Sequence, residues 1–185
     1  MYLIVGLGNP EPEYSKTRHN MGFDTVNMIA KKYKIEFNKR DFDAIYGSGK
    51  IEQEQVILFK PQTYMNESGI AIEKIREFYK IPTENIIVIF DDIDLPEGTV
   101  KIRKKGGPGT HNGMRSVTKE LNSTNFPRVR IGTGMPIFKE LLVNYVIEPL
   151  NDEKYNKLVP AIEKASEATI AIVTKGVDLA MNLYN

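Results

Sequence analysis

Two histidines and no cysteine limit the chemistry that this chain can perform. One of them, His19, lies in the stretch TRHNMGF, soon after the first apolar run. An imidazole gains or loses its proton near neutral pH, so a histidine oriented by a carboxylate can take a proton from water. The chain has no cysteine nucleophile and no Gly-x-Ser-x-Gly turn to present a serine, so water is the expected attacking species.

Polar side chains follow three strand-like runs of the sequence. They are Asn9 after YLIVGL, Asn66 beyond QVILFK and Asp91 at the end of NIIVIF. If these strands run parallel, all three side chains emerge at the carboxyl edge of the sheet, where α/β proteins bind ligands. We expect Asp91 to accept a hydrogen bond from one nitrogen of His19 and to leave the other free. Asn9, Asn66 and Asn112 would then orient the water and bind the oxygen that becomes negative.

Each of these residues also has a purely structural explanation. A single histidine after a strand is more often a hydrogen-bonding residue than a base, and asparagines such as Asn9 and Asn66 cap turns and helices. Asp91 can equally pair with a basic residue. The catalytic interpretation depends on several polar groups meeting at one edge.

Three other kinds of site are disfavoured. Gly6 and Gly8 open a dinucleotide-type turn, but Glu11 stands where the third glycine belongs. The glycine-rich stretch GGPGTHNG is not followed by the Gly-Lys-Ser/Thr of a nucleotide-binding loop. His19 and His111 lie in no known metal-ligand spacing. No cofactor and no metal are therefore expected.

The composition predicts one globular domain of residues 1–185. Hydrophobic residues make up 41% and charged residues 26%, as in ordinary folded proteins. No run is long enough to span a bilayer, and the first residues, MYLIVGLGNP, lack a basic leader and cleavage site. Together with the absence of cysteine, this predicts a cytoplasmic protein without a membrane partner.

Charge is distributed unevenly although the net charge is only +1. Residues 101–130 carry eight lysines and arginines against one acidic residue. Such a stretch can bind a polyanion, although an ordinary solvated face would have a similar composition.

Strand and helix patterns alternate along the chain. Strands are expected at residues 2–7, 44–52, 55–60, 85–90, 99–103 and 128–134; helices at 21–33, 66–79, 114–121, 152–173 and 177–184; and a glycine-rich loop at 106–113. Asn20 is a suitable N-cap for the first helix. This order predicts a single α/β domain with a twisted mixed, mostly parallel β-sheet and helices on both faces.

Five stretches, taken together, resemble bacterial-type peptidyl-tRNA hydrolase. They are LIVGLGNPEPEYSKTRHNMGF (3–23), FKPQTYMNESG (59–69), DDIDLPEG (91–98), GGPGTHNG (106–113) and RVRIGTGMP (128–136). They occur in the family's order and spacing, and the chain length agrees from end to end. The resemblance implies a metal-free monomer, with no obligate protein partner, that hydrolyses the ester between a peptide and the 3′ ribose of tRNA.

The resemblance also implies roles for individual residues. His19 corresponds to the general base, Asp91 to its supporting carboxylate, and Asn9 to the residue that recognises the peptide end and rejects a free amino group. Residues matching positions that contact the tRNA terminus and orient water are Tyr14, Tyr64, Asn66 and Asn112. Residues implied to bind the phosphate backbone are Lys101, Arg103, Lys104, Lys105 and Arg130.

Two parts of the sequence depart from the family pattern. Position 64 is tyrosine where phenylalanine is common, and Pro108 and Thr110 replace smaller residues in the glycine loop.

Two other functions stay open at this point. The chain could instead be a tRNA 3′-end binding module without catalysis, or a metal-dependent hydrolase of a small ester or amide.

Overall fold

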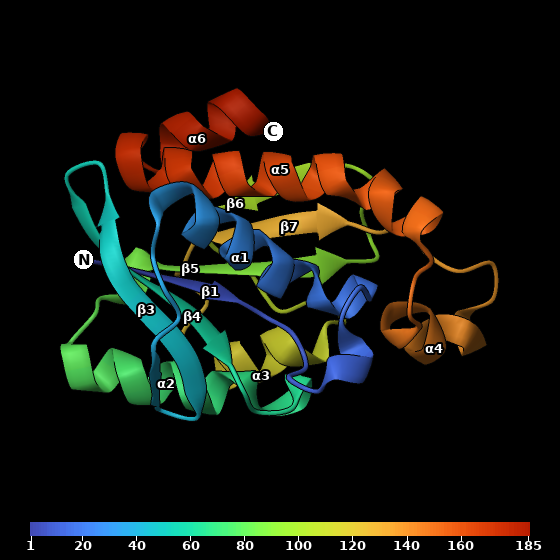
Figure 1. Ribbon diagram of the computed structural model, residues 1–185, viewed down its shortest axis with the longest axis horizontal. Helices are drawn as coiled ribbons and strands as arrows, with labels where there is room; N and C mark the ends of the chain where they lie inside the picture. Colours follow the sequence, from blue (N-terminus) through green and yellow to red (C-terminus); the bar gives the residue numbers. More distant parts are fainter.

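A seven-stranded sheet runs through the centre of the protein, between two layers of helices (Figure 1). The computed structural model describes all residues, 1–185. Its strands are β1 (Tyr2–Gly6), β2 (Lys39–Asp41), β3 (Ala44–Ile51), β4 (Glu54–Pro61), β5 (Ile86–Asp92), β6 (Val100–Arg103) and β7 (Arg128–Gly132). Its α-helices are α1 (Met21–Tyr33), α2 (Ser68–Tyr79), α3 (Asn112–Leu121), α4 (Leu142–Ile147), α5 (Asp152–Lys175) and α6 (Val177–Tyr184). The predicted single α/β domain is confirmed.

The strand order is β2-β3-β4-β1-β5-β7-β6, and the sheet is mixed, as predicted. The four central strands β4, β1, β5 and β7 are parallel, whereas β2, β3 and β6 join antiparallel at the two sides. The carboxyl ends of β1, β4 and β5 therefore meet at one edge of the sheet. This is the arrangement that the candidate site requires.

Helices cover both faces of the sheet. In Figure 1, α1, α5 and α6 lie on one face, and α2 and α3 lie on the other. Two apolar clusters fill the spaces between these layers. All seven residues of β5 are buried, and burial on both faces explains the β-branched run at residues 86–89. None of the helices is both long and apolar enough to cross a membrane.

Glycines let the start of α1 approach the sheet closely. A Cβ atom on Gly22 would lie 2.4 Å from the Ile89 carbonyl oxygen, and one on Gly6 would lie 2.2 Å from the Gly22 carbonyl oxygen. Any larger residue would push α1 away from β1 and β5. Because His19 lies directly before this helix, the two glycines also set the position of His19 relative to β5.

The strand β2 and the helix α4 were not predicted. All three residues of β2 are exposed, and its turn to β3 places Phe42 and Asp43 at φ of 55° and 54°, without the Asn-Gly sequence typical of such turns. Helix α4 has six residues and buries none of them. Strand β2 lacks the apolar alternation on which sequence prediction relies, and α4 is only six residues long, too short for its apolar residues to establish a helical period.

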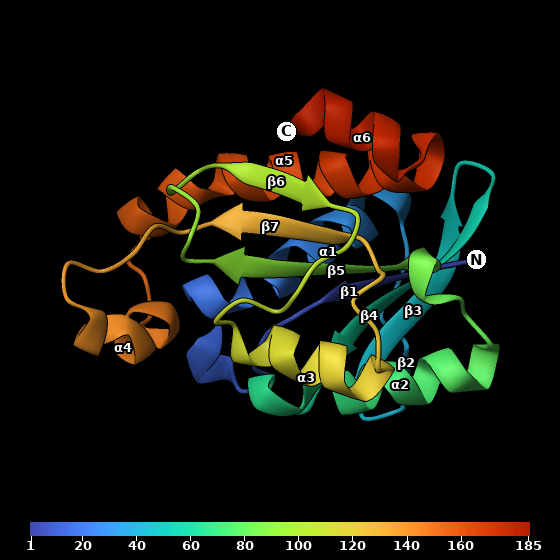
Figure 2. The same cartoon turned by 180° about the vertical axis from the view of Figure 1, so that it is seen from behind.

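Strand β6 forms one edge of the sheet (Figure 2). The side chain of Asn185 covers part of this edge. The Asn185 amide nitrogen donates to the Ile102 carbonyl oxygen at 2.9 Å, and the Asn185 Oδ1 accepts from the Ile102 N–H at 2.7 Å. One amide thus occupies the backbone N–H and C=O of Ile102, which a further strand would otherwise use. The opposite edge, β2, exposes Lys39 and Arg40, whose charges oppose pairing with another strand.

Candidate active site

Asp91 lies between two imidazole rings at the carboxyl end of β5. His19, in the 3₁₀ turn Arg18–Asn20, places its Nδ1 2.8 Å from Asp91 Oδ2. His111, at the N-cap of α3, places its Nε2 3.0 Å from Asp91 Oδ1. The carboxylate is only 1% exposed. Three residues that are distant in sequence therefore form one hydrogen-bonded His–Asp–His unit.

A backbone hydrogen bond determines the tautomers of this unit. The Met114 N–H donates to His111 Nδ1 at 3.2 Å, so the proton of His111 is on Nε2 and is donated to Asp91 Oδ1. Oδ2 remains to accept the Nδ1–H of His19. The His19 Nε2 then carries a free lone pair, as a general base requires.

The same contacts shift two pKa values. Burial by itself would raise the pKa of Asp91, but the charges and hydrogen bonds of His19 and His111 outweigh it and hold the pKa well below its usual range. Burial lowers the pKa of His19, whereas the Asp91 carboxylate raises it, and the net pKa is raised. Asp91 thus stays ionised and makes His19 a stronger proton acceptor.

A glycine allows His111 to pack at the start of α3. A Cβ atom on Gly113 would lie 2.6 Å from Met65 Sδ and 2.9 Å from His111 Cε1. A side chain at this position would displace the ring of His111. The glycine-rich stretch therefore includes one position at which the close approach itself requires glycine.

Asn9 is held rigidly beside this unit. Its Oδ1 accepts from the Met65 N–H at 2.9 Å, and its backbone exchanges two hydrogen bonds with the Asn20 side chain, at 2.8 and 2.9 Å. Asn20 occupies the position expected for the N-cap of α1, but its side chain is used for these bonds and caps nothing. The Asn9 NH₂ group has no partner within the protein and is free to donate into the cavity described next.

A cavity of about 560 Å³ opens over these residues. Its polar lining includes Asn9, His19, Tyr64, Asn66, Asp91, His111 and Asn112. Its basic lining is Arg103, Arg128 and Arg130, and its apolar wall on α4 is Leu142, Val143, Val146 and Ile147. The glycine-rich loop also contributes to the rim. The cavity therefore combines a potential base, amide donors, positive charge and an apolar surface.

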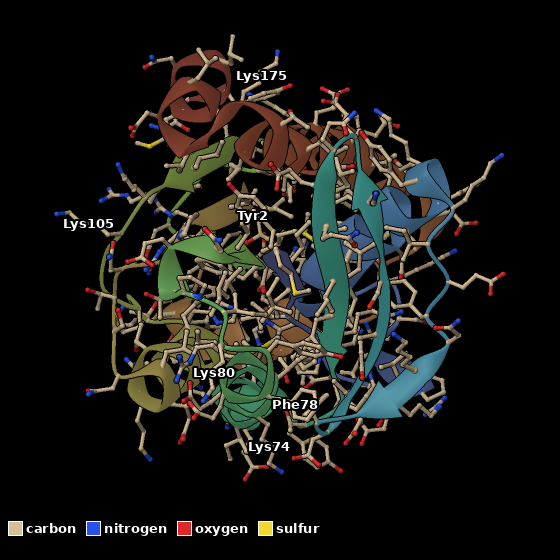
Figure 3. The ribbon with its side chains drawn as sticks, turned by 90° about the vertical axis from the view of Figure 1, so that its left-hand side faces the viewer. Tyr2, Lys74, Phe78, Lys80, Lys105 and Lys175 are labelled. Carbon is tan, nitrogen blue, oxygen red and sulfur yellow. The ribbon has the colours of Figure 1, made fainter.

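Some predicted site residues lie outside the cavity lining. Tyr14 is half-buried in a short turn near the first strand, and Lys101 is exposed on β6 opposite Arg130. The Nζ atom of Lys104 lies 3.3 Å from Oδ1 of Asp178 on α6. Lys105 projects into solvent from the loop after β6 (Figure 3). None of these three lysines is part of the cavity wall.

Arg128 is buried beneath the glycine-rich loop without a carboxylate partner. Its guanidinium donates to the carbonyl oxygens of Gly107 at 3.1 Å and Thr124 at 2.9 Å. Burial, together with the nearby charges of Arg103 and Arg130, lowers the pKa of Arg128 to about 10. The group therefore remains charged at neutral pH. Arg130 differs, because its Nε donates to Asp92 Oδ2 at 2.7 Å.

A protein-family model described as "Peptidyl-tRNA hydrolase" matches residues 3–185. The chain belongs to the peptidyl-tRNA hydrolase family. Peptidyl-tRNA hydrolases of Clostridium novyi (strain NT) and Clostridium botulinum (strain Hall) are each 48% identical to it over 185 residues. The alignments cover all of this chain and 98% and 97% of those relatives. Both the family and the hydrolase class predicted from the sequence are confirmed.

Solved structures agree with this assignment. The crystal structure of peptidyl-tRNA hydrolase from Acinetobacter baumannii matches with a TM-score of 0.92 and 39% identity, covering 100% of this chain and 94% of that one. Uridine phosphorylase from Vibrio fischeri ES114 matches with a TM-score of 0.55 at 10% identity, covering 94% and 92% of the two chains. The second likeness concerns the fold alone.

His111 is the main residue of this candidate site that sequence reasoning missed. It was considered only as a metal ligand, whereas it donates a hydrogen bond to Asp91. The signal was its place directly before Asn112, at the start of a predicted helix, where an N-cap side chain faces the end of a neighbouring strand. Arg128 and Asn20 were also missed as parts of the site, and both act through backbone carbonyl or amide groups.

The His–Asp–His unit is also where a metal ion would find ligands. The ligand atoms of His19, Asp91 and His111 lie within 4.8 Å of one another. In this chain, however, both imidazoles donate N–H bonds to the carboxylate, and His111 Nδ1 accepts from the backbone. A metal would have to displace those protons, so the arrangement fits proton transfer better than metal binding.

Proposed function

We propose that this peptidyl-tRNA hydrolase uses His19 as a general base in releasing peptides, or N-blocked aminoacyl groups, from tRNA. His19 Nε2 takes a proton from water, and the resulting hydroxide attacks the ester carbonyl carbon at the 3′ ribose. The tetrahedral intermediate expels the ribose oxygen, which receives the proton from His19. The single observation that carries the proposal is the 2.8 Å bond from His19 Nδ1 to Asp91, which leaves Nε2 free beside the cavity.

The three asparagines of the cavity have separate proposed tasks. Asn9 donates its fixed NH₂ group to the carbonyl of the peptide end. Asn66 and Asn112, which line the cavity with exposed amides, orient the water and stabilise the negative oxygen of the intermediate. One well-directed donor of this kind contributes about 10²- to 10³-fold to the rate.

Replacing Asn9 by aspartate is expected to lower kcat/KM by about 10²-fold or more, because the carboxylate cannot donate a hydrogen bond. The aspartate oxygen still accepts from the Met65 N–H, so the fold is retained. Deacylation of N-acetyl-aminoacyl-tRNA gives kcat/KM, and thermal unfolding is the control. A value close to that of the wild type would remove Asn9 from substrate recognition.

The tRNA is proposed to bind across the basic side of the cavity. Arg103 and Arg130 reach the lining, while Lys101, Lys104 and Lys105 provide the adjoining surface for backbone phosphates. The Tyr64 ring is 61% exposed at the rim, so it can stack on a base of the tRNA terminus. Tyr14 is proposed to support the same terminus.

Replacing Arg103 by glutamine is expected to weaken tRNA binding and to reduce the slope of log K against log salt by about one, the value for one lost phosphate contact. Lys31→Gln is the matched control, since Lys31 is an exposed lysine near the end of α1 that does not line the cavity. Binding of uncharged tRNA measured over a range of salt concentrations tests both variants. Equal slopes for the two would place the phosphate surface elsewhere.

The protein is proposed to act as a monomer in the cytoplasm. The covered β6 edge and the charged β2 edge support a monomer, because neither offers an open strand to a second copy. The lack of cysteine is consistent with a cytoplasmic location.

Deacylation of N-acetyl-aminoacyl-tRNA by the purified protein is the decisive test of the proposed function. Release of the N-acetyl-amino acid is the expected result, and activity that persists in excess chelator would argue against a metal-dependent mechanism. Binding of tRNA without any release would instead favour a module that binds the tRNA end.

A further inference from the structure

Helix α4 carries the apolar wall of the cavity, but it contributes no buried residue to the hydrophobic core. Its side chains Leu142, Val143, Val146 and Ile147 line the cavity, and none of its residues is buried. Figure 1 shows α4 apart from the other helices, at the end of the sheet where β5 and β7 finish. A six-residue helix is not stable in isolation. Contacts with neighbouring segments must therefore hold it in position.

Arg18 makes several of these contacts. Its Nη1 donates to the Tyr145 carbonyl oxygen and to Glu148 Oε1, both at 2.8 Å. The guanidinium carbon also lies 3.6 Å from the centre of the Tyr145 ring. The Arg18 side chain is only 8% exposed, and a buried charge that loses its partner is costly. Movement of α4 away from the site would leave this charge without its partners.

Two further hydrogen bonds fix the segment around α4. The Tyr145 hydroxyl donates to the Thr133 carbonyl oxygen at 2.6 Å, which joins α4 to the chain leaving β7. The Leu150 N–H donates to the Lys16 carbonyl oxygen at 3.0 Å. Residues 16–18 thus hold α4 from the same stretch of chain that carries His19.

We propose that Arg18 is a positioning residue that holds the α4 wall at a set distance from His19, so that an apolar side chain of the bound peptide packs against this wall. The inference rests on the proposed function and adds to it a peptide-side specificity element. Arg18 precedes His19 in the same 3₁₀ turn, and its two hydrogen-bond acceptors lie on the α4 segment. The wall and the base are therefore held by adjacent residues.

The kinetic test uses one tRNA charged with either N-acetyl-leucine or N-acetyl-glycine. Arg18→Lys keeps the charge but loses the planar stacking on Tyr145, and Glu148→Gln removes the carboxylate partner. We expect each variant to raise KM about tenfold for the leucyl substrate, the scale of a lost charged hydrogen bond, with little change for the glycyl substrate. The kcat and its pH dependence should be unchanged. Lys16→Gln is the matched control, since it removes an exposed ion pair from the same stretch of chain to Asp152 at the start of α5, while the Lys16 backbone carbonyl still accepts from Leu150.

Limited digestion of the folded protein with chymotrypsin provides a readout independent of activity. Cleavage at the exposed Phe138 and Leu141, which precede α4, should be about tenfold faster in both Arg18→Lys and Glu148→Gln than in wild type or Lys16→Gln. Faster cleavage supports release of α4 even if the wild type proves inactive on these substrates, a result that would count against the proposed function alone.

Three results would overturn the proposal. Unchanged KM and unchanged cleavage would show that Arg18 does not hold α4. An equal rise in KM for both substrates would assign Arg18 to tRNA binding. A lower kcat with a shifted pH profile would mean that Arg18 acts on His19 rather than on the wall.

Discussion

Replacing His19 by alanine is expected to lower kcat for release of N-acetyl-amino acids from tRNA by about 10²- to 10⁴-fold, the usual contribution of a general base. The variant loses the only imidazole nitrogen that is free beside the cavity. Residual turnover should come from the amide donors and from substrate positioning. The wild-type rate is expected to fall as the pH is lowered, because protonated His19 cannot accept a proton. The midpoint should lie above the ordinary histidine pKa of about 6.5, since the net effect of burial and Asp91 raises the pKa.

Binding separates the loss of a base from loss of the fold. Affinity for uncharged tRNA should stay within about threefold of wild type, because His19 carries no phosphate contact in the proposed complex. The pH dependence below neutrality should disappear from the residual activity. A His19→Ala variant that retains most of its kcat would require another base.

Replacing Asp91 by asparagine is expected to lower kcat by about 10⁴-fold, the effect of imposing the wrong histidine tautomer in comparable His–Asp pairs. His111 must donate from Nε2, because its Nδ1 accepts from Met114. The asparagine oxygen therefore turns toward His111, and its NH₂ group faces His19 Nδ1. His19 must then accept at Nδ1 and carry its proton on Nε2, so the base is blocked.

A second substitution tests this explanation. In Asp91→Asn/His111→Ala the asparagine is free to turn its oxygen to His19, so kcat should recover by at least about tenfold relative to Asp91→Asn. His111→Ala alone should cost much less than Asp91→Asn, since the carboxylate still accepts from His19. If the double variant folds but shows no recovery, the effect of Asp91→Asn is not due to the tautomer. Steady-state deacylation rates and thermal unfolding of all three variants provide the comparison.

The pairing of His19 with Asp91 could be predicted because a local sequence pattern marks the position of each residue. Asp91 ends a fully apolar run, which indicates a buried parallel strand, and His19 lies in the loop after the first strand. Parallel strands bring such ends together, so the secondary structure pattern was sufficient to place the two residues at one edge.

The remaining parts of the site depend on tertiary contacts that leave no periodic pattern. His111 is placed by the start of α3 and by the absence of a side chain at Gly113. Helix α4 is held by Arg18, which lies far from it in sequence. Arg103 and Arg130 of the basic stretch line the cavity, but the count of charges alone did not distinguish Lys105 in solvent from Arg130 at the cavity. Whether a basic side chain faces solvent or the cavity depends on the strand register and on the course of the loop.

The enclosure of Arg128 affects how the protein responds to ionic strength. Mobile ions weaken attraction between exposed charges beyond a Debye length of about 8 Å at 0.15 M salt, but they cannot surround a charge enclosed by protein. As salt is added, the attraction of phosphate to the exposed lysines should fade first, and that to Arg128 should persist. Long-range capture of a nucleic acid and its final seating over the cavity would then differ in their sensitivity to electrolyte.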